Sequence, residues 1–235
     1  GSWHGRPVRQ RAMTLQDLIA LFRCDAKDVE EPYLWGETQV VGWFNEAQSE
    51  AAVRGRLLLD DSTPAVCEIA VAADIASYQL HPKVYEIAHL RFVGASASEG
   101  RELSVVSREY LDRKDPHWRD RCSDEPRFAI QSETRLRLVP TPREVGMLRL
   151  EAYRLPLKQL THCHDKPEIH EAHHAYLVHW ALYRAFGQPD ADGFDPGKSQ
   201  QSYSVFEGYF GMRPDSDLRR ATRHDQPHTN VIHLP

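Results

Sequence analysis

The sequence predicts an α+β protein: a helical bundle with an inserted antiparallel β-domain and an extended C-terminal tail. Apolar residues recur with helical spacing near both ends of the chain. Between them, short alternating stretches are interrupted by Pro, Gly and Ser, a pattern typical of antiparallel strands. We therefore expect an N-terminal extension (1–13), a bundle (14–60 and 161–224), an inserted β-domain (61–160) and a tail (225–235).

Two helices are predicted before the β-domain. The first is expected from Thr14 to Phe22, because Thr14 and Asp17 have the spacing of a capping box. The second is expected over residues 37–58, with Arg54 near an end where basic side chains favour the helix dipole. The residues expected on its buried face are Val40, Phe44, Ala47, Ala51 and Leu58.

Short β-branched or alternating stretches predict the strands of the β-domain. They lie at 66–72, 78–80, 84–93, 102–106, 128–131, 134–139 and 147–153. Thr134 to Leu138 alternates as a half-buried strand does, and Pro140 and Pro142 end that strand. The stretch from Met147 to Leu150 is its expected hairpin partner.

Two more helices are predicted after the β-domain. The first spans 167–186, with Asp165 as its cap, Glu168 at capping-box spacing and Gly187 as its stop. The second spans 200–210. Its aromatic residues, expected in the core, are Tyr203, Phe206, Tyr209 and Phe210. Between the two helices, residues 190–195 are expected to form a turn, because the glycine sits too early for a calcium loop.

The stretch His170-Glu171-Ala172-His173-His174 matches the zinc-binding pattern H-E-x-x-H. On a helix, His170 and His174 could reach one ion, with Glu171 as the general base of a metallopeptidase. The downstream ligand of the H-x-x-G-x-x-H type is absent, and we expect the motif on the first exposed turns of its helix. The favoured interpretation is therefore no metal, no cofactor and no catalysis, with a zinc metallopeptidase as the alternative.

Composition excludes several classes of protein. The hydrophobic content of 41% and charged content of 27% are ordinary for a soluble globular protein, and no apolar run reaches eighteen residues. The four cysteines form no C-x-x-C pair, which fits a reducing cytoplasm. The net charge of −5 gives no bulk electrostatic case for nucleic-acid binding. Arginines outnumber lysines 23 to 6, which suits protein interfaces but also follows from G+C-rich coding.

In order along the chain, these pieces resemble the head–tail adaptor (connector) proteins of tailed phages. The resemblance runs from about Thr14 to Gly211. The phrases that carry it are Pro32–Trp35, Trp43–Ala47, Glu50–Leu58, Tyr78–Pro82, Tyr110–Asp112, Trp118, Pro126–Phe128, Leu136–Pro142 and the helix at Pro167–His170 continuing through Leu177 to Ala185. In that family the late helix carries no metal chemistry, which further disfavours the peptidase.

The resemblance implies a structural virion protein made in the host cytoplasm. Copies would form a ring, typically of twelve, which joins the portal to the tail and leaves a channel through which DNA passes unbound. No membrane contact is implied.

The C-terminal segment is the expected portal contact. The residues expected to bind the partner are Arg219, Arg220, Arg223, Asn230, Val231, Ile232 and Leu234. The apolar end of the chain suits either a strand donated to a neighbour or an unstructured tail, and the sequence leaves both open.

Overall fold

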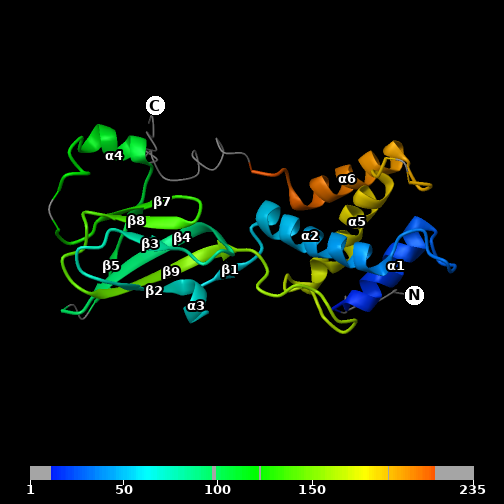
Figure 1. The fold of residues 1–235 in the computed structure, drawn as a ribbon, viewed down its shortest axis with the longest axis horizontal. Helices are drawn as coiled ribbons and strands as arrows, with labels where there is room; N and C mark the ends of the chain where they lie inside the picture. Colours follow the sequence, from blue (N-terminus) through cyan, green and yellow to red (C-terminus); the bar gives the residue numbers. More distant parts are fainter. Residues whose placement is uncertain (1–11, 97–98, 122, 190, 215–235) are drawn as a thin grey trace, which may run out of the picture. The chain divides into compact units, whose positions relative to one another are not determined.

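The computed structural model describes residues 12–96, 99–121, 123–189 and 191–214. They divide into a helical unit, formed by the chain up to Leu58 and by Leu155–Arg213, and a β unit formed by Leu59–Arg154 (Figure 1). The predicted α+β class is confirmed. None of the described helices combines the length and apolarity needed to cross a bilayer.

The helical unit has four α-helices and one short 3-10 helix. They are α1 (Leu15–Ala26), α2 (Glu37–Gly55), η1 (Glu171–Tyr176), α5 (Leu177–Phe186) and α6 (Pro196–Phe210). The predicted capping box of α1 is confirmed, since the Thr14 hydroxyl accepts the Asp17 N–H and the Asp17 carboxylate accepts the Thr14 N–H. The next free N–H groups of α1, at Leu15 and Gln16, donate to carbonyls of the 163–165 loop. These hydrogen bonds join the two segments of the chain that make up the helical unit.

Helix α2 is shorter than predicted. It ends at Gly55, where Arg56 takes a left-handed conformation (φ 50°) and its N–H donates to the Ala52 carbonyl. Four of the five residues expected on its buried face are buried: Val40, Phe44, Ala47 and Ala51. Leu58 lies beyond the helix and is only partly buried.

The core of the helical unit surrounds α5, which contacts α1, α2 and α6. The indole of Trp35 packs edge-on against Phe22 and Phe186, with ring centroids 5.8 and 5.6 Å apart. On α6, Phe206 and Phe210 are buried as expected, whereas Tyr209 is 40% exposed, so the expected core position is wrong for Tyr209. The side chain of Tyr209 instead stacks on Tyr176 at the surface.

The single helix predicted over 167–186 is wrong. The chain enters a 3-10 helix only at Glu171, and the α-helix begins at Leu177. The two expected capping residues serve other segments: the Asp165 carboxylate accepts the N–H groups of Thr161 and His162, and Glu168 accepts that of Leu157. Because those side chains bind upstream turns, residues 165–168 stay outside the helix.

Helix α6 begins four residues earlier than predicted. Pro196 occupies the first turn, and the Asp195 carboxylate accepts the Lys198 N–H at 3.0 Å. Phe194 and Asp195 close the preceding turn through backbone hydrogen bonds to Ala191 and Phe186. The described part of 190–195, from Ala191 onward, is therefore a turn that caps a helix, and Asp190 lies outside the described residues.

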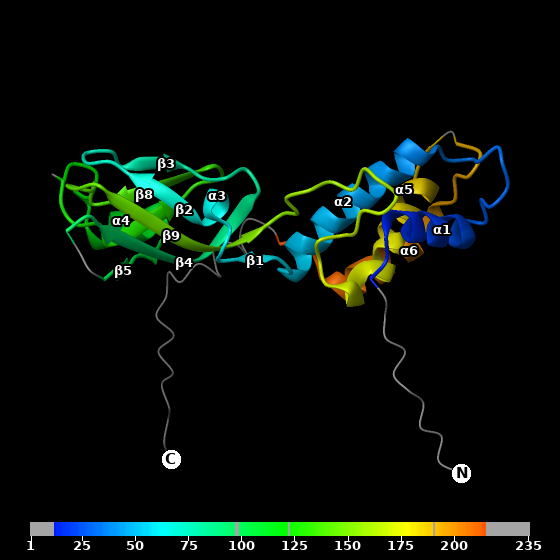
Figure 2. The ribbon, with the colours of Figure 1, turned by 90° about the horizontal axis from the view of Figure 1, so that it is seen from below.

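The β unit contains two sheets (Figure 2). The first has the order β1-β9-β4-β5, with β2 also paired to β9, and the second has the order β3-β8-β7-β6. The strands are β1 (Leu59–Asp60), β2 (Glu68–Val71), β3 (Ser77–Gln79), β4 (Val84–Gly94), β5 (Arg101–Glu102), β6 (Ser104–Val105), β7 (Phe128–Gln131), β8 (Arg135–Val139) and β9 (Gly146–Arg154). All pairs are antiparallel except β6 with β7.

The predicted hairpin of 134–139 with 147–150 is wrong. Strand β8 pairs with β3 and β7 in the second sheet, whereas β9 pairs with β4, β2 and β1 in the first. The connection through Pro140 and Pro142 therefore carries the chain from one sheet to the other, and Val139–Pro140 is a cis peptide. Proline cannot donate to a ladder, which suits a connection that leaves one sheet.

Two short helices in the β unit were not predicted: α3 (Pro64–Cys67) and α4 (Arg108–Lys114). The Ser107 hydroxyl caps α4 by accepting the Tyr110 N–H at 3.1 Å. Helix α4 buries Leu111 in a small cluster with Val106, Trp118, Ile130 and Val139. This cluster covers one side of the second sheet.

Candidate functional site

The H-E-x-x-H stretch forms a turn of 3-10 helix rather than an α-helix. His170 is its N-cap, and the His170 Nδ1 accepts the Ala172 N–H at 3.2 Å. A 3-10 helix has three residues per turn, so residues four apart do not lie above one another. The geometry that would let His170 and His174 share one ion is therefore absent from this segment.

His174 is a buried structural residue. It is 2% exposed, its Nδ1 accepts the Met13 N–H at 3.1 Å, and its Nε2 lies 2.9 Å from the Ile169 carbonyl oxygen. Since a carbonyl can only accept, the proton sits on Nε2 and both ring nitrogens are in use. The expectation that the motif lies on exposed turns of its helix is wrong for His174. Its imidazole joins the start of α1 to η1 instead of facing solvent.

His173 and Tyr209 attach η1 to α6. The His173 Nδ1 lies 3.1 Å from the Tyr209 hydroxyl, and the rings of Tyr176 and Tyr209 stack with centroids 3.5 Å apart. Burial lowers the pKa of His173, and the neighbouring imidazoles of His170 and His174 lower it further. Within the described parts of the chain, no group of three His, Cys, Asp or Glu side chains is placed to hold a metal ion.

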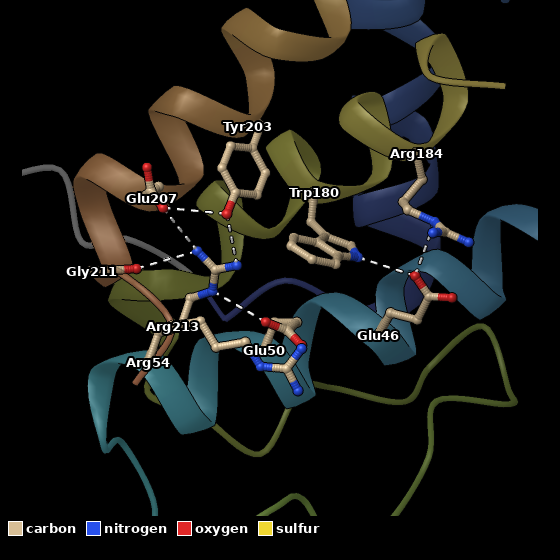
Figure 3. Close-up of polar contacts among 9 residues, drawn as sticks. All are labelled: Glu46, Glu50, Arg54, Trp180, Arg184, Tyr203, Glu207, Gly211 and Arg213. Atoms are coloured by element: carbon tan, nitrogen blue, oxygen red, sulfur yellow. Dashed lines mark hydrogen bonds and ion pairs between the residues drawn. The ribbon is translucent and has the colours of Figure 1, made fainter. Parts of the chain in front are cut away.

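A polar cluster of the helical unit centres on Arg54 of α2 (Figure 3). Its side chain is 3% exposed, and its guanidinium contacts Glu50 at 3.1 Å, Tyr203 at 3.3 Å and Glu207 at 3.7 Å. It also donates to the Gly211 carbonyl at 3.3 Å. Burial alone would lower the pKa of Arg54, but the hydrogen bonds with Tyr203 and Glu50 raise it above its ordinary value. The arginine is therefore fully charged. It joins α2 to the C-terminal half of α6 and to Gly211, the residue that follows α6.

Aromatic rings enclose the same guanidinium. The centroids of Trp180, Tyr203 and Phe206 lie 5.3 to 5.6 Å from the Arg54 Cζ, within cation–π range. This contact compensates for some of the lost hydration of the charge. The sequence signalled Arg54 only as a basic residue near a helix end, and its partners on α6 follow from tertiary packing.

A groove of about 520 Å³ lies beside the Arg54 cluster, between α2 and α5. The Glu46 carboxylate accepts the Trp180 Nε1–H at 3.2 Å and pairs with Arg184 at 3.2 Å (Figure 3). The other lining residues are Gly42, Asn45, Ser49, Glu50 and Gln159. Its two carboxylates, Glu46 and Glu50, are each paired with arginines of the same unit.

The β unit has a buried ion pair of its own. Asp60 accepts the Arg154 Nε–H at 2.5 Å and the Thr63 N–H at 2.9 Å. Burial opposes the ionisation of Asp60, but the hydrogen bonds from Thr63 and Arg154 hold its pKa well below the ordinary value. Burial raises the pKa of the nearby Cys67 thiol to about 11, and the Asp60 carboxylate contributes to that rise. Cys67 is therefore an inert thiol at neutral pH.

The residues predicted to bind the portal lie outside the described residues. They are Arg219, Arg220, Arg223, Asn230, Val231, Ile232 and Leu234. The last described residues before them are Arg213, whose guanidinium lies 3.6 Å from the Glu50 carboxylate, and Pro214. The point at which the C-terminal segment leaves the helical unit is thus fixed beside the Arg54 cluster.

No curated protein matches the chain. The model of the SU10 adaptor protein family matches residues 13–229, which include both compact units. This is a structural rather than a catalytic family, in agreement with a histidine motif whose imidazoles serve the fold. A match over most of the sequence shows that the chain belongs to the SU10 adaptor protein family, a family of phage head–tail adaptors.

Proposed function

We propose that this chain is a ring-forming head–tail adaptor that joins the portal to the tail of a phage particle. The observation that carries the proposal is the family match over residues 13–229, because it includes both units and the segment that follows α6. In the ring, twelve copies surround a channel for DNA. The protein is made in the host cytoplasm and functions in the virion at the head–tail interface.

The C-terminal segment is the proposed portal contact. Its arginines (Arg219, Arg220 and Arg223) can form bidentate pairs with carboxylates, and its apolar end can add to a partner's sheet. The Arg54 cluster supports this assignment, since it binds the Gly211 carbonyl and so directs the chain as it leaves α6. Each proposed domain has its own contact. The bundle (14–60 and 161–224) packs against the neighbouring copies in the ring, and the tail (225–235) reaches the portal.

The DNA channel requires a surface that lets phosphate pass. The chain has 34 acidic and 29 basic side chains, which favours a lumen that does not hold DNA. Duplex DNA is expected to bind no tighter than weak, salt-sensitive, non-specific association. Submicromolar affinity at physiological salt, or any sequence preference, would contradict an adaptor role.

The direct test is reconstitution with the portal and tail proteins encoded beside this chain in its genome. We expect electron micrographs to show a twelve-fold ring of this protein between the two partners. The matched variant lacks Asp225–Pro235, keeps the described fold and is expected not to join the portal. A monomer that binds neither partner, or a truncated chain that assembles normally, would reject the corresponding part of the proposal.

A further inference from the structure

Four large apolar side chains are exposed on two loops at one end of the helical unit. Val29, Tyr33 and Leu34 lie in the loop between α1 and α2, and Phe194 lies in the loop between α5 and α6; their exposed fractions are 63%, 42%, 45% and 48%. The two loops meet at the same end of the unit (Figure 2). Gly193 lies against Leu34 and the Trp35 ring, so closely that a Cβ on it would come within 2.5 Å of that ring. We call these four residues the apolar tip.

The apolar tip is held from beneath by a buried ion pair. Asp28 pairs with Arg23, and both side chains are 7% exposed. The Asp28 carboxylate also accepts the backbone N–H of Leu34 at 2.8 Å and that of Trp35 at 3.4 Å. The Arg23 guanidinium lies 4.1 Å from the centroid of the Tyr33 ring. A charged pair that fixes the backbone beneath exposed apolar side chains preorganises a surface for binding, because little ordering remains to be done on contact.

The rim of the apolar tip is acidic. The exposed charged residues of the described parts of the two loops are Lys27, Glu30, Glu31 and Asp192, three acids to one lysine. Such a rim repels nucleic acid and favours a protein surface with an apolar pocket bordered by arginine or lysine. Exposed apolar side chains surrounded by charge are typical of a protein docking site.

The position of the apolar tip on the helical unit favours the tail-side protein over the portal as its partner. Helix α6 starts beside Phe194 and ends at Phe210, a separation of roughly 20 Å for a helix of this length. The C-terminal segment, assigned to the portal, leaves from the far end of α6, next to Gly211 and Arg54. An adaptor that joins two different proteins needs a second docking surface distinct from the first.

We propose that the apolar tip docks into a basic-rimmed apolar pocket on the tail-side protein of the virion. This inference rests on the proposed function, because it assigns the second of the two partners of the adaptor. The aromatic ring of Tyr33 and the side chain of Leu34 fill the pocket, and Glu30 and Glu31 pair with its basic rim.

The test uses the full chain with the separately purified portal and tail proteins of the same phage. The tip variant is Tyr33→Ser with Leu34→Ser, and the charge variant is Glu30→Lys with Glu31→Lys. The control is Ile75→Ser with Val145→Ser, which removes two side chains of similar exposure (50% and 54%) from the β unit. Melting temperature and assembly mass are measured for each variant, and binding to each partner is measured by light scattering and interferometry.

We expect the tip variant to lose at least tenfold in affinity for the tail protein while its ring mass and portal binding match the control. The charge variant is expected to lose affinity for the tail protein most at low salt. Unchanged tail binding in a folded tip variant would overturn the tip assignment while the adaptor function stands. Loss of the ring in the tip variant would assign the tip to a contact with another copy, and loss of portal binding would assign it to the portal. Either result would overturn the proposed contact with the tail protein. A wild-type chain that binds neither partner would reject the adaptor function itself, and the tip assignment with it.

Discussion

The imidazole of His174 accepts a hydrogen bond from the backbone N–H of Met13 through Nδ1 at 3.1 Å, across 161 positions of sequence. Its other nitrogen donates to the Ile169 carbonyl at 2.9 Å. One side chain thus joins the segment before α1 to the segment before α5. A residue that matches a zinc-ligand pattern in sequence is, in the folded chain, a bridge between two backbone segments.

Replacement of His174 should therefore destabilise the helical unit without any effect of metal. His174→Ala leaves the Ile169 carbonyl and the Met13 N–H without their partner and opens a cavity, at a cost of about 2–4 kcal/mol in the free energy of unfolding. His170→Ala removes only a cap at an exposed position and should cost about 1 kcal/mol or less. Urea denaturation of both variants measures the difference.

Metal analysis is the companion measurement. Protein purified without a nickel column should contain well under one zinc per chain, and a chelator should leave its melting temperature unchanged. Stoichiometric zinc that is lost in both variants would support the metallopeptidase hypothesis and contradict the purely structural role of His174.

Local patterns predicted most of the elements but not their partners. The capping box at Thr14 and Asp17 was readable because it involves residues three apart, and strand 128–131 was placed at its observed bounds. The hairpin of β8 with β9 was wrong because neighbouring strands in sequence usually pair, whereas here the connection changes sheets. Helix 167–186 was extended too far because Asp165 and Glu168 look like capping residues although they bind loops upstream.

The site features missed by sequence depend on contacts across long separations. Arg54 meets Tyr203 and Glu207 about 150 residues later, and Gly193 meets Trp35 through loop packing. The sequence indicated Arg54 only through its place near a helix end, where basic side chains favour the helix dipole. A buried arginine cannot be distinguished from a solvated one without the elements that cover it.

Acidification should destabilise the protein before its carboxylates titrate. Burial lowers the pKa of His173 and of His179, the latter against a weaker opposing effect of Asp25. The unfolded chain, with histidine pKa values near 6.5, therefore binds more protons than the folded chain below that pH. The stability that these two neutral histidines contribute should be fully present above about pH 6.5. It should be lost as the pH falls through their lowered pKa values in the folded protein.

Urea midpoints at pH 7.5, 6.5 and 5.5 measure this loss. The double variant His173→Gln with His179→Gln should show a flatter dependence over the same interval, because its side chains there do not titrate. An equal slope in wild type and variant would assign the loss to other groups.

Cys67 should be protected from alkylation by its burial and by the neighbouring carboxylate. With a pKa of about 11, only about one thiol in a thousand is ionised at pH 8. The exposed Cys24 and Cys163 serve as internal controls in the same chain. Iodoacetamide followed by peptide mass spectrometry should modify both controls in the native protein and spare Cys67.

Asp60→Asn should release that protection. It removes the negative charge that raises the thiol pKa and weakens the pairing with Arg154, so the free energy of unfolding should fall by about 3–5 kcal/mol. Alkylation of Cys67 should then speed up relative to Cys24. Equal protection in the variant would show that burial alone controls the thiol.

Replacement of Arg54 should strongly destabilise the helical unit. Arg54→Ala leaves Glu50, whose side chain is 17% exposed, without its buried partner and frees the Gly211 carbonyl. The expected cost is about 3–5 kcal/mol in the free energy of unfolding. Arg54→Lys keeps the charge but loses the planar fork that reaches Glu50, Tyr203 and Gly211 at once, so its stability should fall between wild type and Arg54→Ala.

Arg213→Ala is the matched control, because Arg213 also pairs with Glu50 but is 65% exposed and should change stability by no more than about 0.5 kcal/mol. Urea denaturation of the three variants decides the order, and a loss in Arg213→Ala as large as that in Arg54→Ala would mean that the Glu50 carboxylate, rather than the buried guanidinium, holds α2 to α6.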